Sequence, residues 1–210
     1  MQELPEGFEE TFGPSIRAYL LDALVRAYNS VCEHHRPELG FDESTFGYNL
    51  YRLVVFELSH SAKQSDGLYT VKTRTPRFRL QASHFEVGCY RVGRSATEDI
   101  WTSFPGNDDA APALLEQQLW LPNVEKESSI KKAKNLILAH LGNFEDGLGA
   151  VYLCVPSRVE RDRIAGWAFA HLLWKQGDQM PSSVRPSIEL VPEETVPEPQ
   201  IGKIRKTMES

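Results

Sequence analysis

Cysteine is scarce in this sequence, and the few cysteines lie far apart. The 210 residues include three of them, Cys32, Cys89 and Cys154. An odd number of distant cysteines without a C-x-x-C pair indicates neither a disulfide framework nor a zinc or thioredoxin-type motif. We expect reduced thiols that pack as small apolar side chains. We also expect no metal and no cofactor.

Long apolar runs are absent as well. No stretch approaches the roughly 18 apolar residues that a transmembrane helix requires. The first residues, MQELPE, are acidic where a secretory signal peptide is basic and then apolar. These features predict a soluble cytoplasmic protein that does not associate with membranes.

The sequence also lacks the motifs that mark the commonest enzymes. It contains no G-x-x-x-x-G-K-[ST] or G-x-G-x-x-G phosphate loop, no G-x-S-x-G elbow, and no zinc-protease, deaminase or EF-hand signature. Catalysis is therefore disfavoured but not excluded.

What the sequence does contain is an average globular composition with an uneven distribution of charge. Hydrophobic residues make up 41% and charged residues 25%, which is enough apolar material for a packed core. The formal net charge is −6. Residues 1–60 carry ten acidic and four basic side chains, whereas residues 68–94 carry six basic and one acidic. A basic segment within an acidic chain is a candidate surface for an anionic partner.

Two amphipathic helices are predicted in the first third of the chain. Apolar residues recur at three- and four-residue spacing after Pro14, which predicts a helix over residues 14–35. A second, more apolar helix should begin after Asp42 and continue to about Lys63.

After a turn at residues 65–67, the apolar pattern changes to a period of two. Three antiparallel strands are predicted at residues 68–74, 77–83 and 85–92. In the middle strand, alternate residues should face the core and the solvent, which gives this meander a wet, basic face.

The last third predicts two buried strands and a helix. Residues 136–141 and 150–155 are apolar at both odd and even positions, as in strands covered on both faces. Ser157 and Glu160 then form an S-x-x-E capping box, which predicts a helix over residues 159–175. The chain is thus expected to be a single α+β domain, residues 1–176. In it, two N-terminal helices and a C-terminal helix pack on a mainly antiparallel sheet of about five strands. Residues 177–210 form a proline-rich tail, expected to be flexible and largely extended or disordered.

The basic face of the meander is the first candidate site. We expect its cations to cluster on one surface that binds phosphate or carboxylate groups. A solvated sheet face that balances the acidic helices is the alternative. The residues concerned are Lys72, Arg74, Arg77, Arg79 and Arg91.

His140 is the second candidate, because it ends a buried strand just before a glycine-bounded loop. Glu145 and Asp146 are near enough in sequence to act as carboxylate partners of a histidine general base. A hydrogen-bonded structural histidine is the alternative interpretation.

The end of the tail is the third candidate. Two isoleucines stand among basic residues there and resemble a short amphipathic docking segment, against the alternative of a disordered terminus. These residues are Ile201, Lys203, Ile204 and Arg205.

Together these signals favour a non-catalytic intracellular binding or regulatory protein that engages an acidic protein partner through the basic face and the tail. The first alternative is a nucleic-acid-binding protein that uses the same arginines. The second is a hydrolase-type enzyme with His140 as general base.

Overall fold

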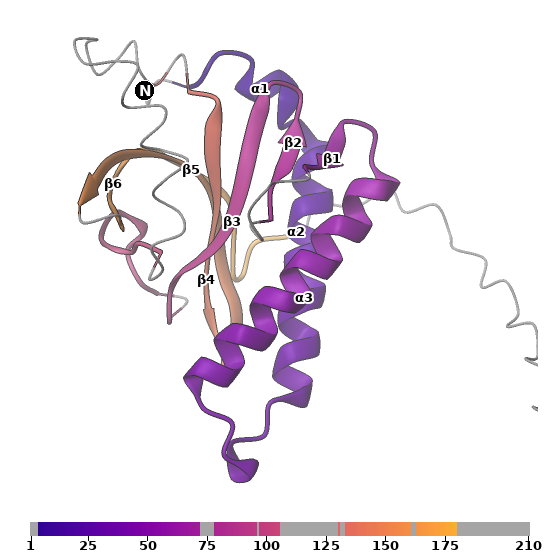
Figure 1. Cartoon of the computed structure of the whole chain (residues 1–210), viewed down its shortest axis with the longest axis vertical. Coiled ribbons are helices and arrows are strands. Elements are labelled where there is room, and N and C mark those ends of the chain that lie inside the picture. The colour runs from indigo at the N-terminus through magenta and orange to yellow at the C-terminus, as the bar shows by residue number, and fades with distance from the viewer. Residues whose placement is uncertain are drawn as a thin grey trace, which may run out of the picture.

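Helices occupy the first part of the chain and strands the rest. The structure is a computed structural model. It describes residues 4–71, 78–95, 97–105, 130, 133–160 and 163–179, without the side chains of residues 158–160. Figure 1 shows the two long helices side by side along one face of a sheet. The α+β class is therefore confirmed. The helices are α1 (Phe8–Thr11), α2 (Pro14–His34) and α3 (Glu43–Gln64), with short 3-10 turns at Pro37–Leu39 and Ile100–Thr102.

Both long helices begin and end within one residue of the predicted bounds. Pro14 occupies the first turn of α2, where its missing N–H costs no intrahelical hydrogen bond. The Asp42 carboxylate caps α3 by accepting a hydrogen bond from the Thr45 backbone N–H at 2.8 Å. The apolar stripe of α2, including Leu20, Leu24 and Ala27, is fully buried.

The sheet has six strands, which are hydrogen-bonded in the order of the sequence. All neighbouring strands are antiparallel except β3 and β4, which are parallel. The sheet is thus mixed, with one more strand than expected. The strands are β1 (Leu68–Thr70), β2 (Leu80–Ala82), β3 (Phe85–Gly93), β4 (Asn135–Asn143), β5 (Gly147–Glu160) and β6 (Arg163–Lys175).

Half of β3 pairs on one side only. Strand β2 is so short that it pairs only with Phe85–Val87 of β3. From Gly88 onward, β3 pairs with β4 alone within the described residues. The Glu86 N–H donates to the Lys134 carbonyl at 2.8 Å, so in a parallel ladder the backbone groups of Cys89 and Arg91 face away from β4. This open edge faces α3 and borders the site described below.

The predicted C-terminal helix at residues 159–175 is wrong. Most of this segment is strand β6, and the expected capping residues Ser157 and Glu160 lie in β5. β-bulges interrupt the pairing of β5 with β6, and a bulge adds one residue to a strand. As a result Ile164 and Trp167 are buried on the same face of the sheet, although they are three residues apart. This spacing imitates the period of a helix.

Both faces of the sheet are covered. The larger core lies between the sheet and the helices, and a second one lies on the opposite face. On that face the Trp167 Nε1–H points to the carbonyls of Ile100 and Ser103, at 2.9 and 3.1 Å. These contacts fasten the segment that follows β3 onto the sheet.

Several sequence predictions concern residues beyond the described ones. They include the ends of the first two predicted strands, the tail at residues 177–210 beyond Gln179, and its docking residues Ile201, Lys203, Ile204 and Arg205. The division into a domain and a tail stays a prediction. None of the described helices has the length and apolarity needed to cross a bilayer.

The Trp167 contacts predict a measurable effect on stability. In Trp167→Phe the two carbonyls lose their donor, and we expect the free energy of unfolding to fall by about 2 kcal/mol. Trp174→Phe is the matched control, because the Trp174 Nε1–H donates to Asp178 at the exposed end of the sheet, at 3.3 Å. Its loss should be under about 0.5 kcal/mol. Urea unfolding followed by circular dichroism measures both, and equal losses would contradict this account of the second core.

Candidate functional site

A pocket of about 550 Å³ lies between α3 and the open edge of β3. It brings together two residues that the sequence singled out for different reasons, Arg91 and His140. They are direct neighbours in the parallel register of β3 and β4. The remaining lining residues are Ser44, Gly47, Leu50, Tyr51 and Val54 of α3, together with Cys89, Tyr90 and Pro105.

The Arg91 side chain is fixed by contacts from two layers. Its Nε–H is shared between the carbonyls of Gly93 and Gly142, at 3.1 and 2.9 Å. Its Nη1 lies 2.6 Å from Oε1 of Glu43, in the first turn of α3. The guanidinium also lies over the ring of Phe46, with its carbon 5.1 Å from the ring centre. The cation is therefore held in one place.

These contacts leave part of the Arg91 guanidinium unsatisfied. Nη2 is buried and has no hydrogen-bond partner in the described part of the chain. Oε1 of Glu43 lies close to Nη1, but it accepts no hydrogen bond of acceptable geometry from these residues. A buried donor without an acceptor costs about 1–3 kcal/mol. The site therefore favours a ligand that supplies an acceptor oxygen.

His140 is paired with Tyr28, a buried residue of α2. The Tyr28 hydroxyl lies 2.9 Å from Nδ1 of His140, and the two rings are perpendicular. Gly142 makes this packing possible, because a Cβ at that position would lie 2.6 Å from the Tyr28 ring. A glycine beside the predicted catalytic histidine thus serves to seat an aromatic ring.

Burial keeps His140 neutral. Desolvation, with a smaller contribution from the Arg91 charge, lowers the pKa of His140 to about 3. Desolvation also raises the pKa of Tyr28, so its hydroxyl keeps its proton. If Tyr28 donates that proton to Nδ1, no buried hydroxyl hydrogen is left unpaired. We infer that the His140 proton is on Nε2, which has no hydrogen-bond partner among the described residues.

This protonation state makes His140 a hydrogen-bond donor and a poor general base. A base with a pKa near 3 provides little driving force for proton abstraction at neutral pH. Cys89 is no better as a nucleophile, because burial raises the pKa of its thiol and keeps it protonated.

The carboxylates predicted to assist His140 lie elsewhere. Glu145 and Asp146 are exposed in the turn between β4 and β5, where the Asn143 side chain bonds to both. No hydrogen bond or ring contact joins either of them to His140 in the described structure. The expected catalytic group of His140, Glu145 and Asp146 is therefore not assembled.

The expected basic face is not assembled by its described members. Arg79 is only 5% exposed and lies on the sheet face opposite the helices, 2.9 Å from the Tyr90 hydroxyl and 3.3 Å from Glu86. Arg91 lies on the helix side, so these two arginines share no surface. The other three candidates, Lys72, Arg74 and Arg77, lie outside the described residues.

Sequence reasoning missed Tyr28, Glu43 and Gly47. Tyr28 lies in the apolar stripe of α2, so its pattern in the sequence indicates an ordinary core residue. Glu43 follows the α3 cap, where an acidic residue in the first turn of the helix is common and indicates no particular function. Gly47 offers a signal, because glycine inside a helix costs about 1 kcal/mol relative to alanine and so suggests a local reason for its presence.

The state of His140 is open to a direct test. Long-range proton–nitrogen correlation spectra should show a neutral ring with its proton on Nε2 from pH 7 to pH 5. The unfolded chain protonates near the ordinary value of 6.5, so the free energy of unfolding should fall as the pH drops from 6.5 toward 3. His140→Gln should lack this part of the pH dependence. A ring that titrates near pH 6.5, or that carries its proton on Nδ1, would contradict the assignment.

Comparisons with known proteins add no identification to this geometry. A scan against protein-family models finds no match, and searches of curated proteins and of solved structures find none either.

Proposed function

We propose that this chain is a non-catalytic binding or regulatory protein that receives an acidic side chain of a protein partner in the pocket beside Arg91. The observation that carries the proposal is the partly buried, fixed guanidinium whose buried Nη2 lacks a partner among the described residues. A carboxylate supplies oxygens in the planar arrangement that a guanidinium recognises best.

The fixed position of Arg91 favours affinity. Ordering a flexible arginine on binding costs side-chain entropy, about 0.5–1.5 kcal/mol for a side chain of this kind. Here the carbonyls of Gly93 and Gly142 and the ring of Phe46 already hold it. A ligand therefore meets a donor group that is ordered in advance.

Gly47 gives the pocket its space. Among the described residues, a Cβ placed at this position would have Arg91 Nη1 as its one neighbour within 4 Å, at 4.0 Å, once its own helix turn is set aside. A larger side chain would therefore extend over the guanidinium. The conformational cost of a helical glycine is offset if the pocket has to stay open for a ligand.

A neutral His140 suits binding better than hydrolysis. His140 lines the same pocket, and in the protonation state inferred above its ring carries an Nε2–H donor. Two lining residues that carry hydrogen-bond donors, Arg91 and His140, suit the oxygens of a carboxylate. The hydrolase alternative requires a proton acceptor at this place, which a ring with its proton on Nε2 does not provide.

The nucleic-acid alternative stays a prediction that rests on Lys72, Arg74 and Arg77. Neither Arg79 nor Arg91 is available as an exposed phosphate contact, because each forms an ion pair with a glutamate of this chain. If those three cations bind phosphates, the affinity should fall steeply with added salt.

Substitutions of Gly47 test the proposed site without weakening helix α3, because other residues have a higher helix propensity than glycine. Gly47→Ala should raise the free energy of unfolding by about 0.5–1 kcal/mol and leave binding intact. Gly47→Leu should fill the space beside Arg91 and abolish binding. The probes are two immobilised peptide libraries that differ only at the central residue, glutamate in one and glutamine in the other. We expect the wild-type protein to retain the glutamate library selectively.

The two variants serve as controls for each other. Urea unfolding establishes that Gly47→Leu is folded, so a loss of binding in that variant reports on the pocket. Equal retention of both libraries by the wild type would refute the proposal. So would unchanged selectivity in a folded Gly47→Leu.

A further inference from the structure

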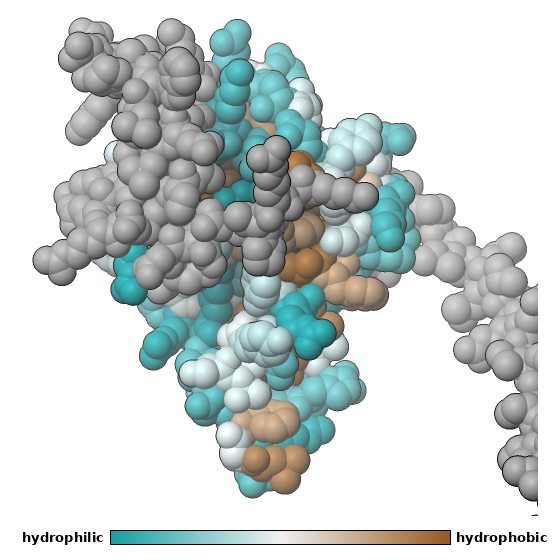
Figure 2. Space-filling view, in the orientation of Figure 1, coloured by the Kyte–Doolittle hydropathy of each residue, from teal (hydrophilic) through white to brown (hydrophobic). Residues whose placement is uncertain are grey.

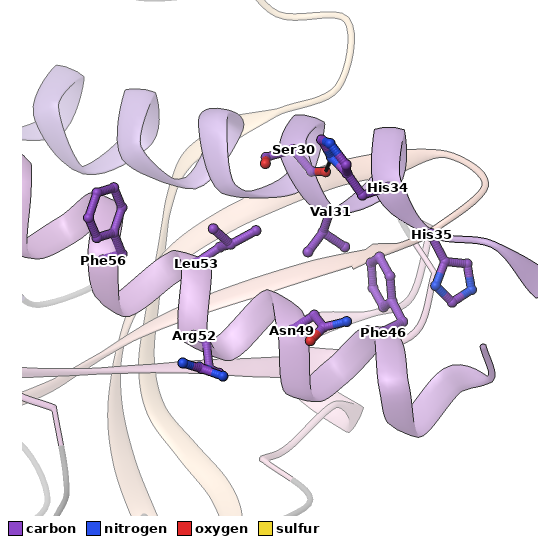
Figure 3. Close-up of a pocket in the computed structure, with 9 residues that line it drawn as sticks. All are labelled: Ser30, Val31, His34, His35, Phe46, Asn49, Arg52, Leu53 and Phe56. Carbon is purple, nitrogen blue, oxygen red and sulfur yellow. Dashed lines mark hydrogen bonds between the residues drawn. The ribbon is translucent and has the colours of Figure 1, made fainter. Parts of the chain in front are cut away.

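A second hollow lies between α2 and α3. It is a groove of about 510 Å³ whose lining residues all lie in α2, at the C-terminal end of α2 or in α3. Figure 3 shows Ser30 and His34 of α2 along one side, Asn49 and Arg52 of α3 along the other, and Val31 and Leu53 between them. An apolar base with a few polar groups at the margin is typical of small-ligand sites of this size.

Aromatic rings line the groove at both ends. Phe56 lies at one end and is 63% exposed, although it is a large apolar side chain. Phe46 and His35 lie at the other end, with their ring centres 5.6 Å apart in an edge-to-face arrangement. The Phe46 ring is fully buried, so Phe56 is the ring that a ligand can contact. An exposed ring beside an apolar base favours a flat, apolar ligand body.

Arg52 provides an uncompensated charge beside the groove. The other two arginines of α2 and α3 are paired, Arg17 with Glu9 and Arg26 with both Asp22 and Glu57. In the described part of the chain no carboxylate lies within ion-pair distance of Arg52, whose guanidinium instead lies 5.8 Å from the centre of the Tyr48 ring. An anionic group is therefore the complementary ligand.

His35 adds a polar atom that lacks a partner. The residue is 8% exposed, and its Nε2 is buried with no hydrogen-bond partner in the described residues. Such an atom costs stability unless a ligand or a water molecule bonds to it. In Figure 3 its ring stands next to Phe46, on the lining of the groove.

Most other exposed apolar residues of this region do not line the groove. Figure 2 shows brown atoms gathered at the lower tip of the molecule, over the loop that joins α2 and α3. This loop contains the exposed Leu39 and Phe41. Neither residue lines the groove or the Arg91 pocket, so the groove is the more specific feature.

We propose that the groove between α2 and α3 is a binding site for a small aromatic carboxylate, with its ring on the apolar base of Val31 and Leu53 beside Phe56 and its charge on Arg52. This site is separate from the Arg91 pocket and does not depend on the function proposed for it.

The experiment compares a charged ligand with a neutral one of the same shape. The probes are naphthalene-2-carboxylate and 2-naphthamide, titrated into the full chain by calorimetry. We expect the wild-type protein to bind the acid about tenfold more tightly than the amide, the usual effect of one charge-assisted contact. Arg52→Gln should remove this difference. Phe56→Ala should weaken both ligands by a similar factor.

Two further variants locate the effect. Lys63→Gln removes another exposed cation of α3, outside the groove, and should leave both affinities unchanged. Gly47→Leu blocks the Arg91 pocket and should also leave them unchanged. The proposal is overturned if the acid and the amide bind equally to the wild type, or if Arg52→Gln keeps the difference. It is also overturned if Gly47→Leu, rather than Arg52→Gln, removes the binding of the acid.

Discussion

The contacts of one partly buried cation, Arg91, join the two layers of this fold. Its ion pair with Glu43 ties the start of α3 to the sheet, and its Nε–H holds the ends of β3 and β4 through the Gly93 and Gly142 carbonyls. Separation of these elements would break the ion pair and leave the Nε–H and both carbonyls without their partners, which costs stability. The same contacts set α3 opposite the half of β3 that pairs with β4 alone within the described residues, and the Arg91 pocket is the space left between them.

Next to this cation, the protein keeps a histidine neutral. Low polarity around His140 and the nearby Arg91 charge both oppose its protonation, while the Tyr28 hydroxyl fixes one of its ring nitrogens. In such an environment an imidazole is more useful as a fixed donor than as a base. The Arg91 pocket is thus lined by a fixed cation and a neutral imidazole, an arrangement that favours recognition of oxygen atoms over proton transfer.

Local signals in the sequence predicted most of the helices and strands. The predictions that failed depend on contacts between segments that are distant in the sequence. The helices were predictable because the apolar spacing, Pro14 and the Asp42 cap act within a few residues. β6 was not, because bulges against β5 place Ile164 and Trp167 on one face at a helical spacing. Arg91 and His140 were each singled out, but their adjacency depends on a parallel pairing across a long connection, which no local pattern encodes. The carboxylates chosen for His140 were neighbours in sequence only.

The central claim is that the Arg91 guanidinium, already held by this chain, still binds a carboxylate from a partner. The most direct test follows the side-chain nitrogen–proton signals of Arg91 by NMR at low temperature. The ligands are N-acetylglutamate α-amide and its glutamine counterpart, which differ only in having a side-chain carboxylate or carboxamide. We expect saturable shifts and slower exchange of the Nη protons with the glutamate ligand and no change with glutamine. Arg91 signals that stay unchanged at saturating concentrations of the glutamate ligand would contradict the account.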